Sequence, residues 1–275
     1  MTGGGVPASI RNSPVPGHAQ KLPVVLLHGI GGGKEQWSPQ LDQLAEHGWR
    51  AVAWDMPGYG ESAPLSAPCT FEALASAVIR LLDALAIERA ILAGHSMGGM
   101  VALETCALHP DRVAGLVLAC TSAAFGSKDG AWQRRFIDER LAPLDAGRGM
   151  SELAARQVPR MMTRHAAPEA RERAIAIMSA VPEATYRLAL ECLVTFDRRE
   201  ALARIAVPAL ALAASDDVQA PPAIMEKMAQ RIAGAEYELL TNCGHLANLE
   251  APAAFGAAVV DFLDRRLLSP MDDHA

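Results

Sequence analysis

The sequence predicts an α/β protein in which helices flank a mostly parallel central sheet and a helical cap is inserted into the chain. Short apolar runs alternate with stretches of helical periodicity, which is typical of strands joined by crossover helices. The runs are almost continuously apolar, as expected of parallel strands that helices cover on both faces. The chain has 275 residues, 51% of them hydrophobic, which suffices for one large core with an inserted subdomain.

Six strands are predicted from these runs. They are expected over Val24 to Leu27, Ala51 to Trp54, Ala90 to Ala93, Val113 to Ala119, Ala209 to Ala213 and Tyr237 to Leu240. Helical periodicity predicts helices over Phe71 to Leu85, Gly98 to His109, Pro222 to Ile232 and Pro252 to Leu268. The start of the chain is rich in glycine and proline, so strands ahead of Val24 are expected to be short or absent.

The rhythm of the chain changes between Thr121 and Val207, where helical patterns and proline breaks occur without a convincing strand. We therefore predict a helical cap over residues 121–207 and a core over residues 1–120 and 208–275. Residues 128–173 contain ten Lys and Arg against seven Asp and Glu, so this stretch carries +3 and the rest −9. Either these are solvated helix faces, or an arginine turns inward to hold an anionic substrate.

Composition and charge exclude several classes of protein. A net charge of −6 gives no electrostatic footprint for nucleic acid, and no apolar stretch reaches the roughly 20 residues that a membrane-spanning helix needs. The first 20 residues lack the apolar segment of a secretory signal. Five scattered cysteines without C-x-x-C spacing predict reduced thiols and no zinc site, so we expect a cytoplasmic protein with neither nucleic-acid nor membrane partners. The sequence leaves a homo-oligomer open.

A glycine-flanked serine stands between a predicted strand and a predicted helix, in the run Gly94-His95-Ser96-Met97-Gly98. Such a tight turn strains the serine backbone, and the glycines leave room for the neighbouring strand and helix. The turn projects the hydroxyl of Ser96 above the sheet edge and leaves the Met97 amide at a helix N-terminus, where an anion would be stabilised. We interpret Ser96 as a nucleophile and His95 as structural.

A serine nucleophile needs a base, and the base needs an orienting acceptor. His245 is the candidate base, in the loop between the last predicted strand and the last helix. Asp217 is the candidate acceptor at the end of another strand, with Asp216 as its rival. These positions lie at the carboxyl ends of strands, where open α/β sheets place their ligands. We interpret Cys243, two residues from His245, as a small buried filler and not as a catalytic thiol.

A second oxyanion donor is predicted in a glycine-rich turn after the first strong strand, in the run His28-Gly29-Ile30-Gly31-Gly32-Gly33. The glycines let the backbone approach a ligand, with the Ile30 amide turned toward it. A phosphate loop is the alternative, but the turn lacks both the G-K-[ST] ending and the G-x-G-x-x-G spacing. A mechanism built on these groups needs no metal and no organic cofactor.

Over nearly its whole length the chain resembles α/β-hydrolase fold enzymes. The matching markers are His28-Gly29, Asp55 to Ser62, Gly94 to Gly99, His109 to Val113, Asp217 four residues before Pro221, and Gly244-His245. In that family the catalytic acid usually precedes such a proline by four residues and the histidine by nearly thirty, and here the second interval is 28. The resemblance implies a Ser96, Asp217 and His245 triad, with Asp55 to Ser62 as a structural turn.

Two groups within the family are similar to this chain. Gly98 to Ala102, and Thr121 to Gly126 followed by Trp132, resemble the 3-oxoadipate enol-lactonases, while the spacing from His28 to Trp37 suits the meta-cleavage C–C bond hydrolases. Both groups act on small carboxylate-bearing substrates, which agrees with an arginine-rich cap. The resemblance implies cleavage of an ester or lactone through an acyl-enzyme, with C–C bond hydrolysis of a dienoate as the alternative.

Trp37, Trp132 and Arg135 are the candidate substrate-binding residues. Trp132, Arg135 and Phe136 share one helical face that is expected to cover the pocket, although Trp132 and Phe136 could instead form a cap core with Arg135 in water. A ligand receptor with slow or no turnover is the rival from another class. A haloperoxidase-like enzyme shares the serine turn, whereas a haloalkane dehalogenase is disfavoured because it would need an aspartate at position 96.

Overall fold

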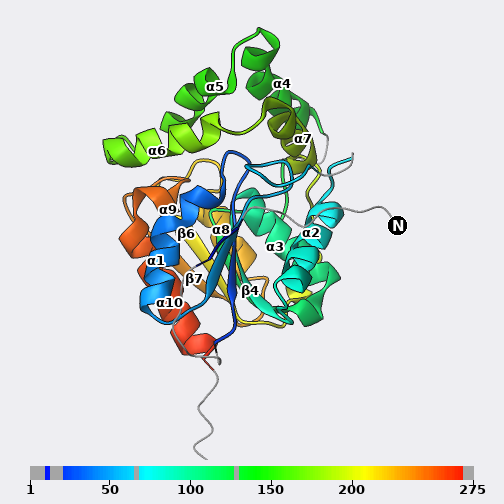
Figure 1. Cartoon of the computed structure of the whole chain (residues 1–275), viewed down its shortest axis with the longest axis vertical. Helices are drawn as coiled ribbons and strands as arrows, with labels where there is room; N and C mark the ends of the chain where they lie inside the picture. The colour runs from blue at the N-terminus through cyan, green and yellow to red at the C-terminus, as the bar shows by residue number, and fades with distance from the viewer. Residues whose placement is uncertain (1–9, 13–20, 65–67, 127–129, 269–275) are drawn as a thin grey trace, which may run out of the picture.

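A computed structural model describes residues 10–12, 21–64, 68–126 and 130–268 and arranges them as a seven-stranded sheet between layers of helices (Figure 1). The strands are β1 (Ile10–Asn12), β2 (Val24–Leu27), β3 (Ala51–Trp54), β4 (Ala90–His95), β5 (Val113–Ala119), β6 (Ala209–Ala214) and β7 (Glu236–Leu240), in the spatial order β1-β3-β2-β4-β5-β6-β7. Strands β2 to β7 are parallel, and β1 is a short antiparallel edge strand. The predicted fold class is confirmed.

Helices cover both faces of the sheet. The core helices are α1 (Ser38–Glu46), α2 (Phe71–Ala84), α3 (Met97–Leu108), α8 (Pro222–Ala229), α9 (Ala247–Glu250) and α10 (Pro252–Arg266), and short 3-10 turns are η1 (Lys34–Trp37), η2 (Pro110–Arg112), η3 (Val158–Arg160) and η4 (Leu202–Arg204). In Figure 1, α1 and α10 lie on one side of the sheet and α2 and α3 on the other. None of the described helices has the length and apolar character needed to cross a membrane.

Strand β2 shows why the strand sequences are continuously apolar. Val25 and Leu27 belong to the core cluster shared with α2, α3 and α8, whereas Val24 and Leu26 belong to the cluster shared with α1 and α10. Successive side chains of a strand point to opposite faces, so a sheet covered twice needs an apolar residue at every position. Each of these buried side chains contributes roughly 1.5–3 kcal/mol relative to exposure.

The helix ends follow local hydrogen bonding. Thr70 caps α2, its hydroxyl accepting the Ala73 amide at 3.2 Å. Helix α8 ends at Ala229, earlier than the predicted Ile232, because the amide of Ile232 bonds to the carbonyl only three residues back and tightens the last turn. Helix α1 was absent from the prediction, since few of its residues are apolar.

The cap helices stand between β5 and β6 in the chain: α4 (Ala131–Asp145), α5 (Met150–Gln157), α6 (Pro168–Ser179) and α7 (Glu183–Leu193). Figure 1 shows them, in green, gathered over one end of the sheet. The core cluster on the α2 and α3 side continues into the cap through buried Leu144, Leu153, Met178 and Leu190. Because this packing is continuous, the cap has a defined position over the loops that follow the strands.

Candidate active site

Ser96 occupies the sharp turn between β4 and α3, with φ 53° and ψ −121°. A non-glycine residue in this region costs of order 1–3 kcal/mol and persists only where its surroundings hold it. The surroundings are tight, because a Cβ on Gly94 would lie 2.3 Å from the Gly98 carbonyl oxygen, and a Cβ on Gly98 would lie 2.1 Å from that of Leu27. The Thr121 hydroxyl also holds the turn by donating to the Ser96 carbonyl at 2.6 Å.

Gly98→Ala is therefore expected to lower the free energy of unfolding by at least about 2 kcal/mol, because the added methyl meets backbone that cannot rotate away. Gly149→Ala is the matched control, since a Cβ there meets nothing within 4 Å, and we expect a loss of at most about 1 kcal/mol because alanine is a poorer N-cap of α5 than glycine. Urea unfolding of both variants measures the difference. Equal stability of the two variants would contradict the close packing described for the turn.

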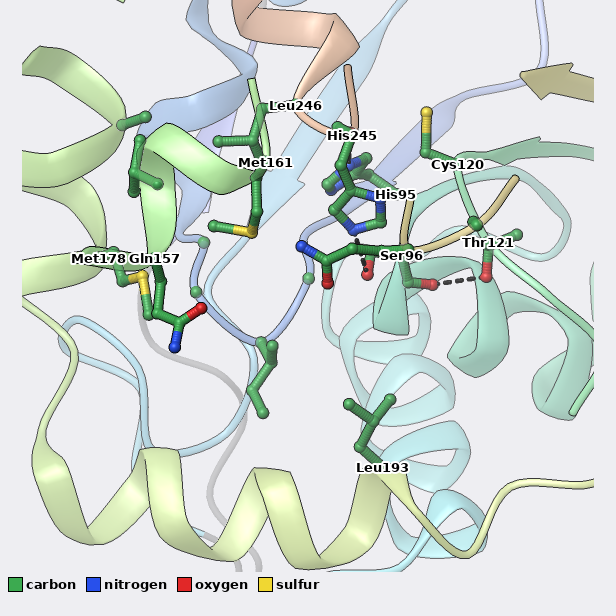
Figure 2. Close-up of a pocket in the computed structure, with 18 of the residues that line it drawn as sticks. His95, Ser96, Cys120, Thr121, Gln157, Met161, Met178, Leu193, His245 and Leu246 are labelled. Carbon is green, nitrogen blue, oxygen red and sulfur yellow. Dashed lines mark hydrogen bonds between the residues drawn. The ribbon is translucent and has the colours of Figure 1, made fainter. Parts of the chain in front are cut away.

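The structure brings Ser96, His245 and Asp217 into one hydrogen-bonded chain. His245 Nε2 lies 3.0 Å from Ser96 Oγ, and His245 Nδ1 lies 2.8 Å from Asp217 Oδ2. Figure 2 shows the His245 ring directly above Ser96 with this hydrogen bond dashed. An ionised Asp217 accepts a hydrogen bond from Nδ1–H, so the proton of the neutral ring stays on Nδ1. Nε2 is then unprotonated and can accept the serine proton.

Asp217 is built to stay ionised although only 3% of its surface is exposed. Burial raises the pKa of this carboxyl, but His245 and the amides of Gln219 and Ala220, at 2.8 and 2.9 Å from Oδ1, outweigh burial and lower the pKa below its usual value. The rival Asp216 is exposed and accepts a hydrogen bond from the Ser215 hydroxyl. Asp217 is thus the aspartate that faces His245.

Two groups outside the predicted site hold the His245 loop. His95 Nε2 donates to the His245 carbonyl at 2.7 Å, and burial, followed by the neighbouring His245, lowers the pKa of His95 to about 3, so its ring is neutral. The Glu250 carboxylate accepts the Gly244 amide at 3.0 Å and the Thr163 amide at 2.9 Å. Glu250 therefore joins the histidine loop to a cap segment.

Sequence reasoning missed Thr121 and Glu250 as parts of the site. Thr121 stands in a segment that served only for the family resemblance, and Glu250 belongs to no motif. A hydroxyl or a carboxylate that bonds a distant backbone amide or carbonyl leaves no periodic or spacing signal. The interpretation of His95 as structural agrees with its buried hydrogen bond. Burial also raises the pKa of the Cys243 thiol to about 11, as expected of a filler that stays protonated.

The glycine-rich turn lies against Ser96. A Cβ on Gly29 would come within 3.0 Å of the Ser96 Cβ, so only glycine fits without a shift. His28 Nδ1 donates to the Gly29 carbonyl, and the Tyr59 hydroxyl donates to the Ile30 carbonyl, both at 2.8 Å. Among the described residues, the amides of Ile30 and Met97 have no hydrogen-bond acceptor. The turn is thus held from behind while its amide stays available.

A cavity of about 950 Å³, its open mouth included, lies between this turn, the Ser96 turn and the cap. Core residues at its wall follow the carboxyl ends of five strands, as an open parallel sheet requires. Figure 2 shows Met161 and Met178 of the cap to the left of Ser96 and Leu193 below it, around the same space. The cap therefore supplies much of the apolar surface that a ligand would meet.

The three predicted substrate-binding residues do not line this cavity. Trp37 is 1% exposed and packs against Phe255, with ring centroids 5.9 Å apart. Its side chain belongs to the core cluster on the α1 and α10 face of the sheet. Trp132 is 39% exposed and stacks on Phe136, and Arg135 is exposed. Of the two arrangements left open for this face, the structure agrees with the alternative in placing Arg135 in water and with the first in bringing Phe136 to the cavity.

The described residues contain no group of three or more His, Cys, Asp or Glu side chains arranged to hold a metal ion. The arrangement that is present suits proton transfer and nucleophilic attack: a serine, a histidine and a buried carboxylate at one end of a cavity.

Comparison with known proteins decides the family. The model of a family described as alpha/beta hydrolase fold matches residues 23–252. The chain belongs to the α/β-hydrolase fold family. A protein of Variovorax paradoxus named as a carbamate hydrolase, RutD, is 34% identical over 91% of this hydrolase and 95% of its own length. The earlier resemblance to this family is confirmed.

Solved structures agree with this assignment. The enol-lactonase of Burkholderia xenovorans LB400 is 32% identical to the hydrolase, with a TM-score of 0.81 over 93% of this chain and 96% of that one. An esterase of Thermogutta terrifontis, 26% identical, superposes with a TM-score of 0.83 over 95% and 94% of the two chains. These relatives are named as hydrolases, and the similarity extends over nearly the whole of each chain, so the protein is a hydrolase.

Proposed function

We propose that this hydrolase cleaves an ester or lactone of a small, carboxylate-bearing substrate through an acyl-enzyme on Ser96. The observation that carries the proposal is the hydrogen-bonded chain from Ser96 through His245 to Asp217, whose serine and histidine line the cavity. Next to Ser96, the amides of Ile30 and Met97 have no acceptor among the described residues. A neutral serine hydroxyl is a poor nucleophile, and this arrangement supplies both the base and the anion-stabilising donors that it needs.

In the proposed reaction, Ser96 Oγ attacks the carbonyl carbon while His245 Nε2 takes the hydroxyl proton. The amides of Ile30 and Met97 donate to the oxyanion, and the Asp217 carboxylate stabilises the charged imidazolium. The C–O bond breaks as His245 returns the proton to the leaving oxygen, and a lactone opens at this step. Water deprotonated by His245 then attacks the ester on Ser96, releasing the acid and restoring the hydroxyl.

Hydrolysis of a carbamate is the second candidate, and the similarity to proteins named as carbamate hydrolases favours it. A carbamate presents the same kind of carbonyl with a heteroatom leaving group, so the same residues would serve. The enol-lactonase neighbour favours the lactone.

A labelling and turnover experiment tests the proposal. A fluorophosphonate is expected to label the protein once, at Ser96, and lactones, short esters and carbamates are then compared for turnover, with kcat of order 1 s⁻¹ or more for the preferred class. Labelling without turnover on any class would indicate the slow receptor and contradict the proposal. Bleaching of a coloured dienoate with no ester turnover would favour C–C bond hydrolysis instead.

We also propose that the reaction takes place in the cytoplasm. All five cysteines are unbridged in the structure, and reduced thiols are typical of that compartment.

A further inference from the structure

The wall of the cavity has an unusual charge balance. Of the residues that line it, none is Asp or Glu, and Arg140 is the one Arg or Lys. Most of the others are aliphatic, aromatic or methionine side chains. Glu139, the one carboxylate whose charge acts on Arg140, lies outside this wall. Within the wall no carboxylate balances the cation, so a ligand anion would be stabilised there.

The surroundings of Arg140 support this interpretation. Its guanidinium carbon lies 3.4 Å from the centroid of the Phe136 ring, and the described residues offer it neither a hydrogen-bond acceptor nor an ion pair. The side chain is half-buried, and this burial lowers its pKa. By contrast, Arg187 and Arg198 each pair with two carboxylates. The donor edge of Arg140 therefore stays available while Phe136 holds its plane.

Tyr186 adds a second donor to the same wall. It comes from α7, lines the cavity and is 2% exposed, and its hydroxyl forms no hydrogen bond with the part of the chain that the structure describes. Burial raises its pKa although the charge of Arg140 acts in the opposite direction, so the phenol stays protonated and can donate. Because Tyr186 lines the cavity, its hydroxyl can donate to a ligand bound there.

We propose that Arg140 and Tyr186 form the carboxylate-binding subsite of the cavity, on the cap side, opposite the Ser96 turn. The substrate is then a monoanion with the scissile carbonyl at one end and a free carboxylate at the other. A guanidinium can bind a carboxylate through two parallel N–H···O bonds, which adds orientation to charge. The expected preference for carboxylate-bearing esters in turnover rests on the proposed function. The expected binding of a carboxylate by Arg140 and Tyr186 does not.

The kinetic test compares two esters that differ only at the far end. Monoethyl glutarate carries a carboxylate where ethyl valerate carries a methyl group. The wild type is expected to have a kcat/KM at least tenfold higher for monoethyl glutarate, and Arg140→Met to lower that ratio at least tenfold, as a lost charge-assisted hydrogen-bond pair predicts. Arg134→Met is the matched control, since Arg134 is exposed on the same helix and should leave the ratio unchanged.

A binding test keeps the two proposals separable. Calorimetry with glutarate is run on Ser96→Ala, with and without Arg140→Met, and thermal unfolding confirms that each variant is folded. At least tenfold weaker binding without Arg140 supports the subsite even if neither ester is hydrolysed, a result that would count against the proposed function alone. Equal glutarate affinity in the two proteins, or a ratio of the two esters that Arg140→Met leaves unchanged, overturns the subsite.

Discussion

Replacing Ser96 by alanine is expected to lower kcat for the preferred ester, lactone or carbamate by at least about three orders of magnitude. The variant keeps the turn, the amides and the cavity but removes the oxygen that lies 3.0 Å from His245 Nε2. Steady-state kinetics on purified protein, with the fluorophosphonate label as a count of active sites, measures the loss. KM is expected to change little, because the hydroxyl contributes to the transition state more than to substrate binding.

Ser76→Ala serves as the control for this variant, since Ser76 is a half-buried residue of α2 outside the cavity wall, and its hydroxyl donates to the Glu72 carbonyl of its own helix. Its activity should match the wild type within about twofold. If Ser96→Ala kept activity near that of Ser76→Ala, the acyl-enzyme mechanism would be wrong, because no other hydroxyl in the described site contacts His245.

Asp217→Asn is expected to lower kcat by about 10⁴, as the equivalent change does in a serine protease triad. The amide cannot accept and stabilise the His245 Nδ1 proton as a carboxylate does, so the ring is driven toward the tautomer whose Nε2 carries the proton and cannot act as base. Asp216→Asn is the control and should lie within about twofold of the wild type, because Asp216 is exposed and faces Ser215. Equal losses in both variants would contradict the assignment of Asp217.

The wild type and Asp217→Asn are also expected to differ in how their free energies of unfolding depend on pH. The pKa of Asp217 is lower in the folded protein than the usual value near 3.9, so its ionisation stabilises the fold above about pH 4. This contribution is lost as the pH falls through the lowered pKa. The difference in free energy of unfolding between wild type and Asp217→Asn should therefore shrink below about pH 4, as measured by urea unfolding.

Local patterns were sufficient to predict much of this molecule. The parallel strands were predicted from apolar runs with polar or glycine-rich ends. Ser96, Asp217 and His245 were predicted to lie together because each follows the carboxyl end of a predicted strand. The choice between Asp216 and Asp217 rested on spacing to Pro221, and the structure places Asp217 against His245. Each of these features depends on residues close in the sequence, or on the rule that parallel strands end at one edge.

The cap residues could not be predicted in the same way. Helical periodicity groups Trp132, Arg135 and Phe136 on one face of α4, but it does not say which part of that face meets the core. Trp132 and Phe136 pack with Phe125 at the rim, and this packing turns Arg135 outward and brings Arg140 to the cavity. Trp37 was misplaced for the same reason, since its burial against Phe255 depends on a helix more than 200 residues later.

The sequence by itself determined the six parallel strands and the strained serine turn, because strand burial and glycine steric limits are local properties. The choice of Asp217 and His245 as the partners of the serine came from the resemblance to the family. Only the tertiary structure decided that Glu250 ties the histidine loop to the cap and that Arg140, with Tyr186, is the polar group of the cavity wall. The reason is physical: which side of a helix is buried depends on the shape and charge of whatever packs against it, and in the cap those partners come from distant parts of the chain.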